Sequence, residues 1–252
     1  MMKRTCVQIA VIAALAVPAG AAPLEIANYS QCVALVDRNA AAAEESARSW
    51  QTHGGGAAAM HCNALALSAL RRYGEAARVL DALARNRDID AADRAQLFDQ
   101  AGNAWLLAGQ GGNAAQSFSE ALAASPNDIA ILADRAHARA MLKDWKGADA
   151  DLSAALLQDQ NRADLLVLRA SARWALGRKE DAATDIVRAL ELYPDYPPAL
   201  VERGRMKYSA GDKAGARKDW SKAAASGQGE AAAAAKRYLA DMGPEDRPLT
   251  GR

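Results

Sequence analysis

Pairs of basic residues recur along the second half of the chain, and their side chains could bind an anion. Within each pair the two residues are four positions apart, so in a helix both lie on one face. The pairs return every 34 residues and are Arg135 with Arg139, Arg169 with Arg173, and Arg203 with Lys207. Guanidinium groups bind carboxylates and phosphates through parallel hydrogen bonds. These pairs therefore indicate either an anion-binding surface or a structural part of the protein.

Aspartates at a fixed spacing favour the structural role. An aspartate follows the first member of each basic pair by 16 positions, at Asp151, Asp185 and Asp219. Two other 34-residue units carry neutral residues at both positions, so the two charges occur together or not at all. We predict three structural ion pairs within repeats, namely Arg135 with Asp151, Arg169 with Asp185, and Arg203 with Asp219. For Arg139, Arg173 and Lys207 this scheme provides no partner, and contact with an anionic ligand stays open.

The N-terminus has the pattern of an export signal. Lys3 and Arg4 precede an apolar run over 7–17, and small residues follow at 19–21. We expect residues 1–21 to be a signal peptide, which would direct the chain to a bacterial periplasm or outside the cell. The run is shorter than the roughly 20 residues that span a bilayer, so no membrane span is expected after cleavage. An uncleaved anchor or a cytosolic N-terminus is the alternative.

Two cysteines, Cys32 and Cys62, remain after the expected cleavage. An even number of cysteines in an exported chain favours a disulfide. The alternatives are two reduced buried thiols, or a metal site that adds His61 and His53, whose spacing matches no closed zinc pattern. We predict the disulfide, and we expect neither a metal nor a cofactor.

Catalytic motifs are absent from the sequence. There is no H-E-x-x-H, no G-x-S-x-G and no P-loop, and no nucleophile, base and orienting group can be assembled. The 31 basic residues nearly balance the 30 acidic ones, so no positive field is present to hold nucleic acid. We therefore expect a protein that is not an enzyme and has no nucleic-acid partner.

A repeat of 34 residues organises most of the chain. Counted from Ala95, small residues occupy the eighth, twentieth and twenty-seventh places of four successive rows, and larger apolar residues occupy the twenty-fourth. Glycine stands at the fifteenth place of three rows, where a helix end favours a left-handed residue. Two helices of about 14 residues joined by a short turn fit each row as an antiparallel hairpin. The low aromatic content, 5%, also favours alanine-rich helices over a sheet.

This combination resembles the tetratricopeptide repeat (TPR) family. The resemblance implies an all-α, right-handed superhelical solenoid of antiparallel helix pairs. The expected units are a degenerate helical hairpin at 22–56, five repeats at 57–90, 95–128, 129–162, 163–196 and 197–230, a capping helix at 230–242, and a disordered tail at 243–252.

In this family the first helix of each repeat lines a concave groove, and most members bind peptides or proteins. The groove-facing places select five candidate binding residues, namely Asn103, His137, Trp174, Arg205 and Tyr208. A family mode that holds a carboxylate with Lys and Asn is disfavoured, because no Lys occupies the corresponding places. We expect a monomeric, non-enzymatic scaffold for a protein or peptide partner in an envelope process. The alternatives are a self-assembling structural component, and an enzyme or metal carrier using His61 and the cysteines.

Overall fold

The computed structural model describes residues 26, 28–227 and 229–242, and in this part of the chain every regular element is an α-helix. The predicted signal peptide, 1–21, and the predicted tail, 243–252, lie outside these residues. The described helices are α1 (Tyr29–Arg38), α2 (Ala40–Thr52), α3 (Gly56–Ala69), α4 (Tyr73–Ala84), α5 (Ala91–Leu107), α6 (Gly111–Ala124), α7 (Ile129–Met141), α8 (Trp145–Gln158), α9 (Ala163–Ala175), α10 (Lys179–Leu192), α11 (Pro197–Ser209), α12 (Lys213–Ala224) and α13 (Glu230–Asp241). The predicted all-α class is confirmed.

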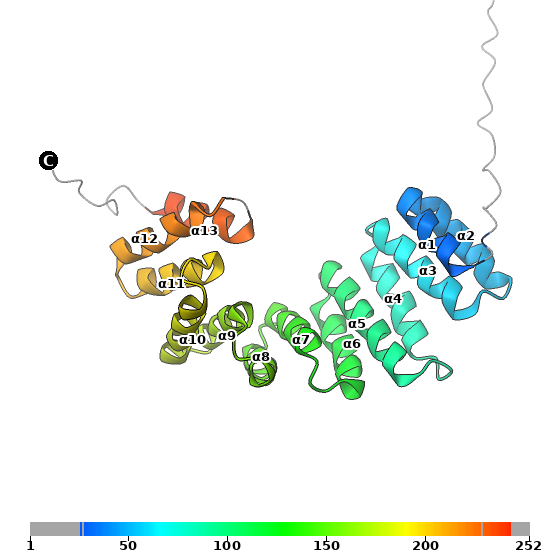
Figure 1. Ribbon diagram of the computed structural model, residues 1–252, viewed down its shortest axis with the longest axis horizontal. Helices are drawn as coiled ribbons and strands as arrows, with labels where there is room; N and C mark the ends of the chain where they lie inside the picture. The colour runs from blue at the N-terminus through cyan, green and yellow to red at the C-terminus, as the bar shows by residue number, and fades with distance from the viewer. Residues whose placement is uncertain (1–25, 27, 228, 243–252) are drawn as a thin grey trace, which may run out of the picture.

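The helices form successive pairs that stack into an open arch (Figure 1). The pairs α3–α4, α5–α6, α7–α8, α9–α10 and α11–α12 fall in the five predicted repeats, although α3 and α5 begin before the repeat boundaries, at Gly56 and Ala91. The side chain of Asp90 caps α5 by accepting from the backbone N–H of Asp93, which explains this early start. The first helices of the last four repeats lie toward the hollow of the arch and the second helices on its outside.

Within each pair, the residue at the eighth place makes room for the one at the twenty-fourth. A Cβ atom on Gly102 would lie 2.6 Å from the ring of Phe118, and one on Gly204 would lie 2.4 Å from Nε1 of Trp220. The intervening repeats combine alanine at the eighth place with Leu152 or Ile186 at the twenty-fourth, both fully buried. Glycine thus accompanies the aromatic residues, and alanine accompanies the aliphatic ones, so each hairpin packs closely.

The turn between paired helices contains one left-handed residue in each of the five repeats. Glycine occupies this place in three of them, with φ of 71° at Gly109, 77° at Gly177 and 87° at Gly211. In the other two, Arg71 (φ 59°) and Lys143 (φ 60°) take the same conformation. Side chains rarely adopt this backbone conformation, so these two turns are held by the packing of the helices on either side.

The two ends of the arch are closed differently. At the N-terminal end, α1 packs on α2 and α3, and Cys32 of α1 forms a disulfide with Cys62 of α3, with their Cα atoms 6.1 Å apart. The predicted disulfide is therefore present. At the C-terminal end, α13 covers the last pair, and Tyr238 stacks on Trp220 with ring centroids 4.9 Å apart.

Candidate functional site in the concave groove

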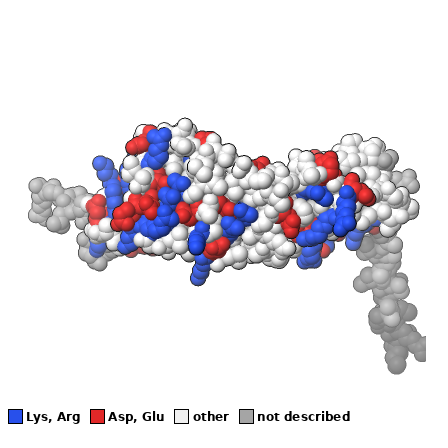
Figure 2. Space-filling view, turned by 90° about the horizontal axis from the view of Figure 1, so that it is seen from below, with Lys and Arg blue, Asp and Glu red and all other residues white. Residues whose placement is uncertain are grey.

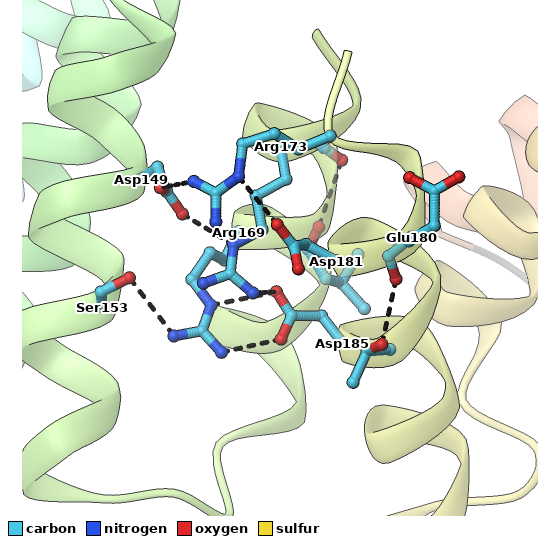
Figure 3. Close-up of polar contacts among 11 residues, drawn as sticks. Asp149, Ser153, Arg169, Arg173, Glu180, Asp181 and Asp185 are labelled. Atoms are coloured by element: carbon cyan, nitrogen blue, oxygen red, sulfur yellow. Dashed lines mark hydrogen bonds and ion pairs between the residues drawn. The ribbon is translucent and has the colours of Figure 1, made fainter. Parts of the chain in front are cut away.

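The predicted ion pairs hold the two helices of each of the last three repeats together. Figure 3 shows the arrangement in the pair α9–α10. Arg169 binds both carboxylate oxygens of Asp185, with Nε–Oδ2 at 3.0 Å and Nη2–Oδ1 at 2.7 Å. Arg135 binds Asp151 and Arg203 binds Asp219 in the same two-bonded way. All three predicted pairs therefore form, and all three aspartates are buried.

The second basic residue of each pair binds the same aspartate. Arg139 contacts Asp151 at 2.8 Å, Arg173 contacts Asp185 at 2.9 Å, and Lys207 contacts Asp219 at 2.9 Å. Arg139, Arg173 and Lys207, whose role the sequence left open, are therefore structural residues. Their charged groups bind a buried carboxylate of the protein itself.

The pKa of Asp219 reflects this double coordination. Burial acts to raise it, but the bonds from Arg203 and Lys207 together outweigh burial and hold the pKa below its usual range. The carboxylate is therefore charged at neutral pH, as an ion pair requires.

Arg173 also connects two repeats. Its Nε lies 2.8 Å from Oδ1 of Asp149 on α8, while its Nη1 binds Asp185 of its own repeat (Figure 3). Arg178 binds the other oxygen of Asp149 at 2.6 Å. Asp149 is thus a shared carboxylate between neighbouring repeats, a role that a comparison of equivalent places within each repeat could not reveal.

The repeat at 95–128 has no such Arg–Asp pair, and a carboxylate from the preceding repeat takes its place. Asp81 of α4 is buried and accepts hydrogen bonds from Trp105 Nε1 at 2.9 Å and from Ser117 Oγ at 2.8 Å. Trp105 and Ser117 belong to α5 and α6, so Asp81 links three helices. The sequence pattern marked this repeat as one of two with neutral residues at both positions, but it did not identify Asp81.

Helices α5, α7, α9 and α11 lie toward the hollow of the arch (Figure 1), and we call the inner surface of these four helices the concave groove. Neighbouring inner helices contact each other, α5 with α7 and α9 with α11. The five predicted binding residues all belong to these four helices. The structure separates them into an acidic group on α5 and α7 and an aromatic and cationic group on α9 and α11.

The acidic group surrounds Asn103. The amide of Asn103 donates to the backbone carbonyl of Asp99 at 3.1 Å, so the side chain is oriented by its own helix. Burial, together with the charges of Asp134 and Asp128, raises the pKa of Asp99 to about 6. Burial also raises the pKa of Asp134, although the hydrogen bond from Asn103 and the charge of His137 oppose this. His137 is exposed beside them.

This acidic character argues against the carboxylate-holding mode. Asp99 and Asp134 occupy the fifth and sixth places of their repeats, which are among the places that this mode fills with Lys and Asn, and their charges would repel a carboxylate. The pKa of Asp99 is raised by burial and by the charge of Asp134 in the next repeat, a proximity that the sequence does not specify.

The aromatic and cationic group centres on Trp174. Arg205 Cζ of α11 and Lys179 Nζ of α10 each lie 5.4 Å from the centroid of the Trp174 ring. Arg205 also forms an ion pair with Glu202 at 2.5 Å. Tyr208 packs beside Trp220 with ring centroids 5.6 Å apart, and it remains 41% exposed. Trp174 and Arg205 are therefore brought together, while Tyr208 is directed toward the C-terminal end.

Large apolar side chains are exposed near the end of several inner helices. They are Leu107 at 65%, Met141 at 42% and Tyr208 at 41%, with Leu142 and Leu176 just beyond the helix ends at 52% and 39%. Aromatic, methionine and arginine side chains are enriched at protein interfaces.

A separate cavity of about 390 Å³ lies at the N-terminal end of the inner surface. His61 lies at its edge and links three helices, with Nδ1 2.6 Å from Tyr29 Oη and Nε2 2.8 Å from Gln100 Oε1. Because the disulfide uses both cysteines, the alternative metal site built on their thiolates with His61 is wrong. Among the described residues, no three potential ligands are grouped for a metal ion.

None of the helices in the described residues combines the length and apolar character needed to cross a bilayer.

No protein-family model matches the chain, and no curated protein matches it in sequence. Solved structures do match. MamA from Desulfovibrio magneticus RS-1 is 22% identical, with 68% of this chain and 94% of that chain covered and a TM-score of 0.58. A double mutant of RS-1 MamA is 19% identical, with 75% and 99% covered and a TM-score of 0.59. The TPR domain of Arabidopsis OM64 is 26% identical, with 48% and 99% covered and a TM-score of 0.45.

Sequence identities this low show only that the chain shares the fold of the MamA structures. Their likeness extends over about two thirds of this chain or more, and it agrees with the paired helices and the 34-residue period. The chain therefore has the TPR fold, an all-helical solenoid of antiparallel helix pairs.

Proposed function

We propose that this protein is a non-enzymatic, exported scaffold that binds a protein or peptide partner in the concave groove and serves an envelope process in the periplasm. The observation that carries the proposal is the inner surface of α9 and α11, where Trp174 is flanked by two cations and Tyr208 is exposed. These side chains are the kind that contribute most binding energy at interfaces. Exposed Leu107 and Met141 extend the apolar surface onto the preceding repeats.

A partner that lies along the groove would meet two different environments. Near α5 and α7 it would meet carboxylates, and near α9 and α11 it would meet aromatic rings with the Arg205 guanidinium and the Lys179 ammonium group. Opposite charges across an interface favour one orientation of the partner. We therefore propose an extended segment with a basic residue near α7 and an apolar or acidic one near α11.

Crosslinking in cells tests the groove. A photoreactive residue placed at Leu107, which is 65% exposed, should crosslink a partner that mass spectrometry identifies. Trp174→Ala combined with Tyr208→Ala should reduce that crosslink. The control is Leu157→Ala on the outer helix α8, where the side chain is 77% exposed. Equal crosslinking by the groove variant and the control variant would reject the groove.

The proposed location has its own test. Export with cleavage after Ala21 predicts a mature chain that begins at Ala22 and appears in a periplasmic extract, as mass spectrometry of the intact protein would detect. A monomer in size-exclusion chromatography is expected for a scaffold, whereas a stable oligomer would favour the self-assembling alternative.

A further inference from the structure

Three arginines surround a cavity of about 470 Å³ on the outer side of the arch, which we call the arginine cavity. Arg85 and Arg87 follow the end of α4, and Arg94 lies in the first turn of α5. The opposite wall is formed by the end of α6 with Glu120, and the buried ring of Phe98 lies at the base. Alanines of α4, α5 and α6 supply the rest of the lining.

The three arginines lack the carboxylate partners that most arginines in the described part of the chain have. Across the described residues, no ion pair forms at Arg85, Arg87 or Arg94, and the nearest specific contact is that of Arg85 Cζ, 5.8 Å from the centroid of Phe98. By contrast, Arg169, Arg188 and Arg205 of the last three repeats bind aspartate or glutamate at 2.5–3.1 Å. The cavity therefore presents guanidinium groups that are free to bind an anion.

A second cavity of the same kind provides an internal comparison. It measures about 480 Å³, and it is lined by α8, α9 and α10, which correspond to α4, α5 and α6 two repeats earlier. Its two arginines are occupied, because Arg169 binds Asp185 and Arg188 binds Glu191 and Asn161. A cavity of this size at this place in the stack therefore occurs in both halves of the arch. Of these two cavities, only the one in the N-terminal half is lined by arginines without an ion pair.

We propose that the arginine cavity binds an acidic peptide segment of a partner protein. Carboxylates of the segment would pair with Arg85, Arg87 and Arg94, since a guanidinium can donate two parallel hydrogen bonds to a carboxylate. Aliphatic side chains between those carboxylates would pack on Phe98 and the alanine methyl groups. None of the five predicted groove residues lines this cavity, so binding in the cavity does not depend on them.

Charge and shape favour a peptide over an anionic bilayer. Segment 85–94 contains three aspartates beside its three arginines, so a flat anionic surface would meet as much repulsion as attraction. A narrow segment can enter the cavity and avoid these aspartates. Viewed from below, the outer face carries interleaved basic and acidic side chains instead of one continuous basic field (Figure 2).

The lining also favours a peptide over inorganic phosphate. Phosphate would use the guanidinium groups and leave the apolar lining without a contact. A peptide with alternating acidic and aliphatic residues would use both the arginines and the alanine surface of the cavity.

The test uses the mature full chain and a blocked, fluorescent peptide with the alternating sequence Glu-Leu-Glu-Leu-Glu. Fluorescence anisotropy should show saturable binding, and the variant Arg85→Gln/Arg87→Gln/Arg94→Gln should weaken it about tenfold. The control variant Lys146→Gln/Lys236→Gln/Arg237→Gln removes the same charge at exposed positions away from the cavity, and should leave affinity within about twofold. Circular dichroism verifies that both variants are folded, and Arg87→Gln alone replaces the triple variant if it is not.

Three results would overturn the proposal. The first is equal peptide affinity in the cavity variant and the control variant. The second is inorganic phosphate binding as tightly as the peptide, which would mean that the apolar lining contributes nothing. The third is binding to phosphatidylglycerol vesicles without binding to the peptide. Trp174→Ala/Tyr208→Ala should not change peptide affinity, so failure at this site and failure of the groove proposal are distinguishable.

Discussion

Arg169 and Asp185 form a two-bonded ion pair that joins the two helices of one repeat, with a donor–acceptor distance of 2.7 Å at Nη2–Oδ1. The side chain of Asp185 is only 4% exposed, and Arg173 binds it as well. Asp185→Asn removes the charge that both guanidinium groups require. We expect a loss of about 3–5 kcal/mol in unfolding free energy, measured in urea, because breaking a buried pair leaves an uncompensated charge.

Two comparisons sharpen this prediction. Arg169→Gln added to Asp185→Asn should cost less than the sum of the separate changes, because both report the same pair. Asp219→Asn should cost less than Asp185→Asn, since Arg203 and Lys207 are 37% and 32% exposed against 17% and 15% for Arg169 and Arg173. An unchanged urea midpoint in Asp185→Asn would contradict the structural role.

Asp99 should make stability depend on pH in the opposite direction from the paired aspartates. Burial and Asp134 raise its pKa to about 6, so the folded state favours the protonated form. This contribution is present below about pH 4 and is lost as the pH rises through 6. Asp99→Asn should therefore be more stable than wild type at pH 7 by about 1 kcal/mol after allowance for solvent screening, and should show no such gain at pH 3.5.

The matched control for Asp99 is Asp37→Asn, which removes the same charge from an exposed face of α1. Asp219 has the opposite sign, because its pKa is lowered by Arg203 and Lys207 against the effect of burial. Its contribution is present above its unfolded pKa and is lost as the pH falls through the folded one. Equal unfolding free energies of Asp99→Asn and wild type at pH 7 would contradict the raised pKa of Asp99.

Gly204→Ala should destabilise the last repeat, because the added Cβ would lie 2.4 Å from Trp220. We expect a loss of about 1–3 kcal/mol in urea unfolding. The same change should cost less in a Trp220→Ile background, which reproduces the combination of Ala170 and Ile186 in the preceding repeat. Equal costs in the two backgrounds would show that the close approach has no energetic role.

Lys143→Gly, in the turn between α7 and α8, should stabilise the protein. Lys143 has a φ of 60° at a place where three other repeats have glycine. Relief of this backbone conformation should add up to about 1 kcal/mol, whereas Gly177→Ala, at the same place, should cost a similar amount. Thermal unfolding of the two variants provides the comparison, and a lower Tm for Lys143→Gly would contradict it.

Reduction of the disulfide between Cys32 and Cys62 should loosen α1 and α2 selectively. A disulfide between residues 30 positions apart is expected to stabilise the folded state by about 2–4 kcal/mol. Hydrogen exchange should therefore accelerate in α1 and α2 when both cysteines are replaced by serine, and remain unchanged in α8 to α12. Uniform acceleration across the chain would mean that the disulfide stabilises the whole array.

The sequence predicted the helix pairs and the ion pairs within repeats because both follow a regular 34-residue period. It missed the second cation at each aspartate, since we assigned one arginine to one carboxylate. A carboxylate has two oxygens and can accept from two cations, as Asp185 does. It also missed the left-handed conformation of Lys143, because residue type signals such a turn only where glycine occupies it.

Contacts between repeats were the least predictable. Asp81 and Asp149 bind side chains of the following repeat, and Asp99 lies near Asp134 of the following repeat. The offset between neighbouring helix pairs determines which of these side chains meet. The period aligns equivalent places but does not specify that offset. For the same reason the sequence selected Trp174 and Arg205 separately, and only the structure brings them into contact.

The uneven distribution of cross-links means that the two halves of the arch would respond to different surroundings. The N-terminal units are joined by a covalent bond that reductants break and by the ion pair of Glu44 with Arg72, whereas the last three repeats are joined by ion pairs that acid weakens. A change of redox conditions would therefore loosen the N-terminal end while the last three repeats keep their shape.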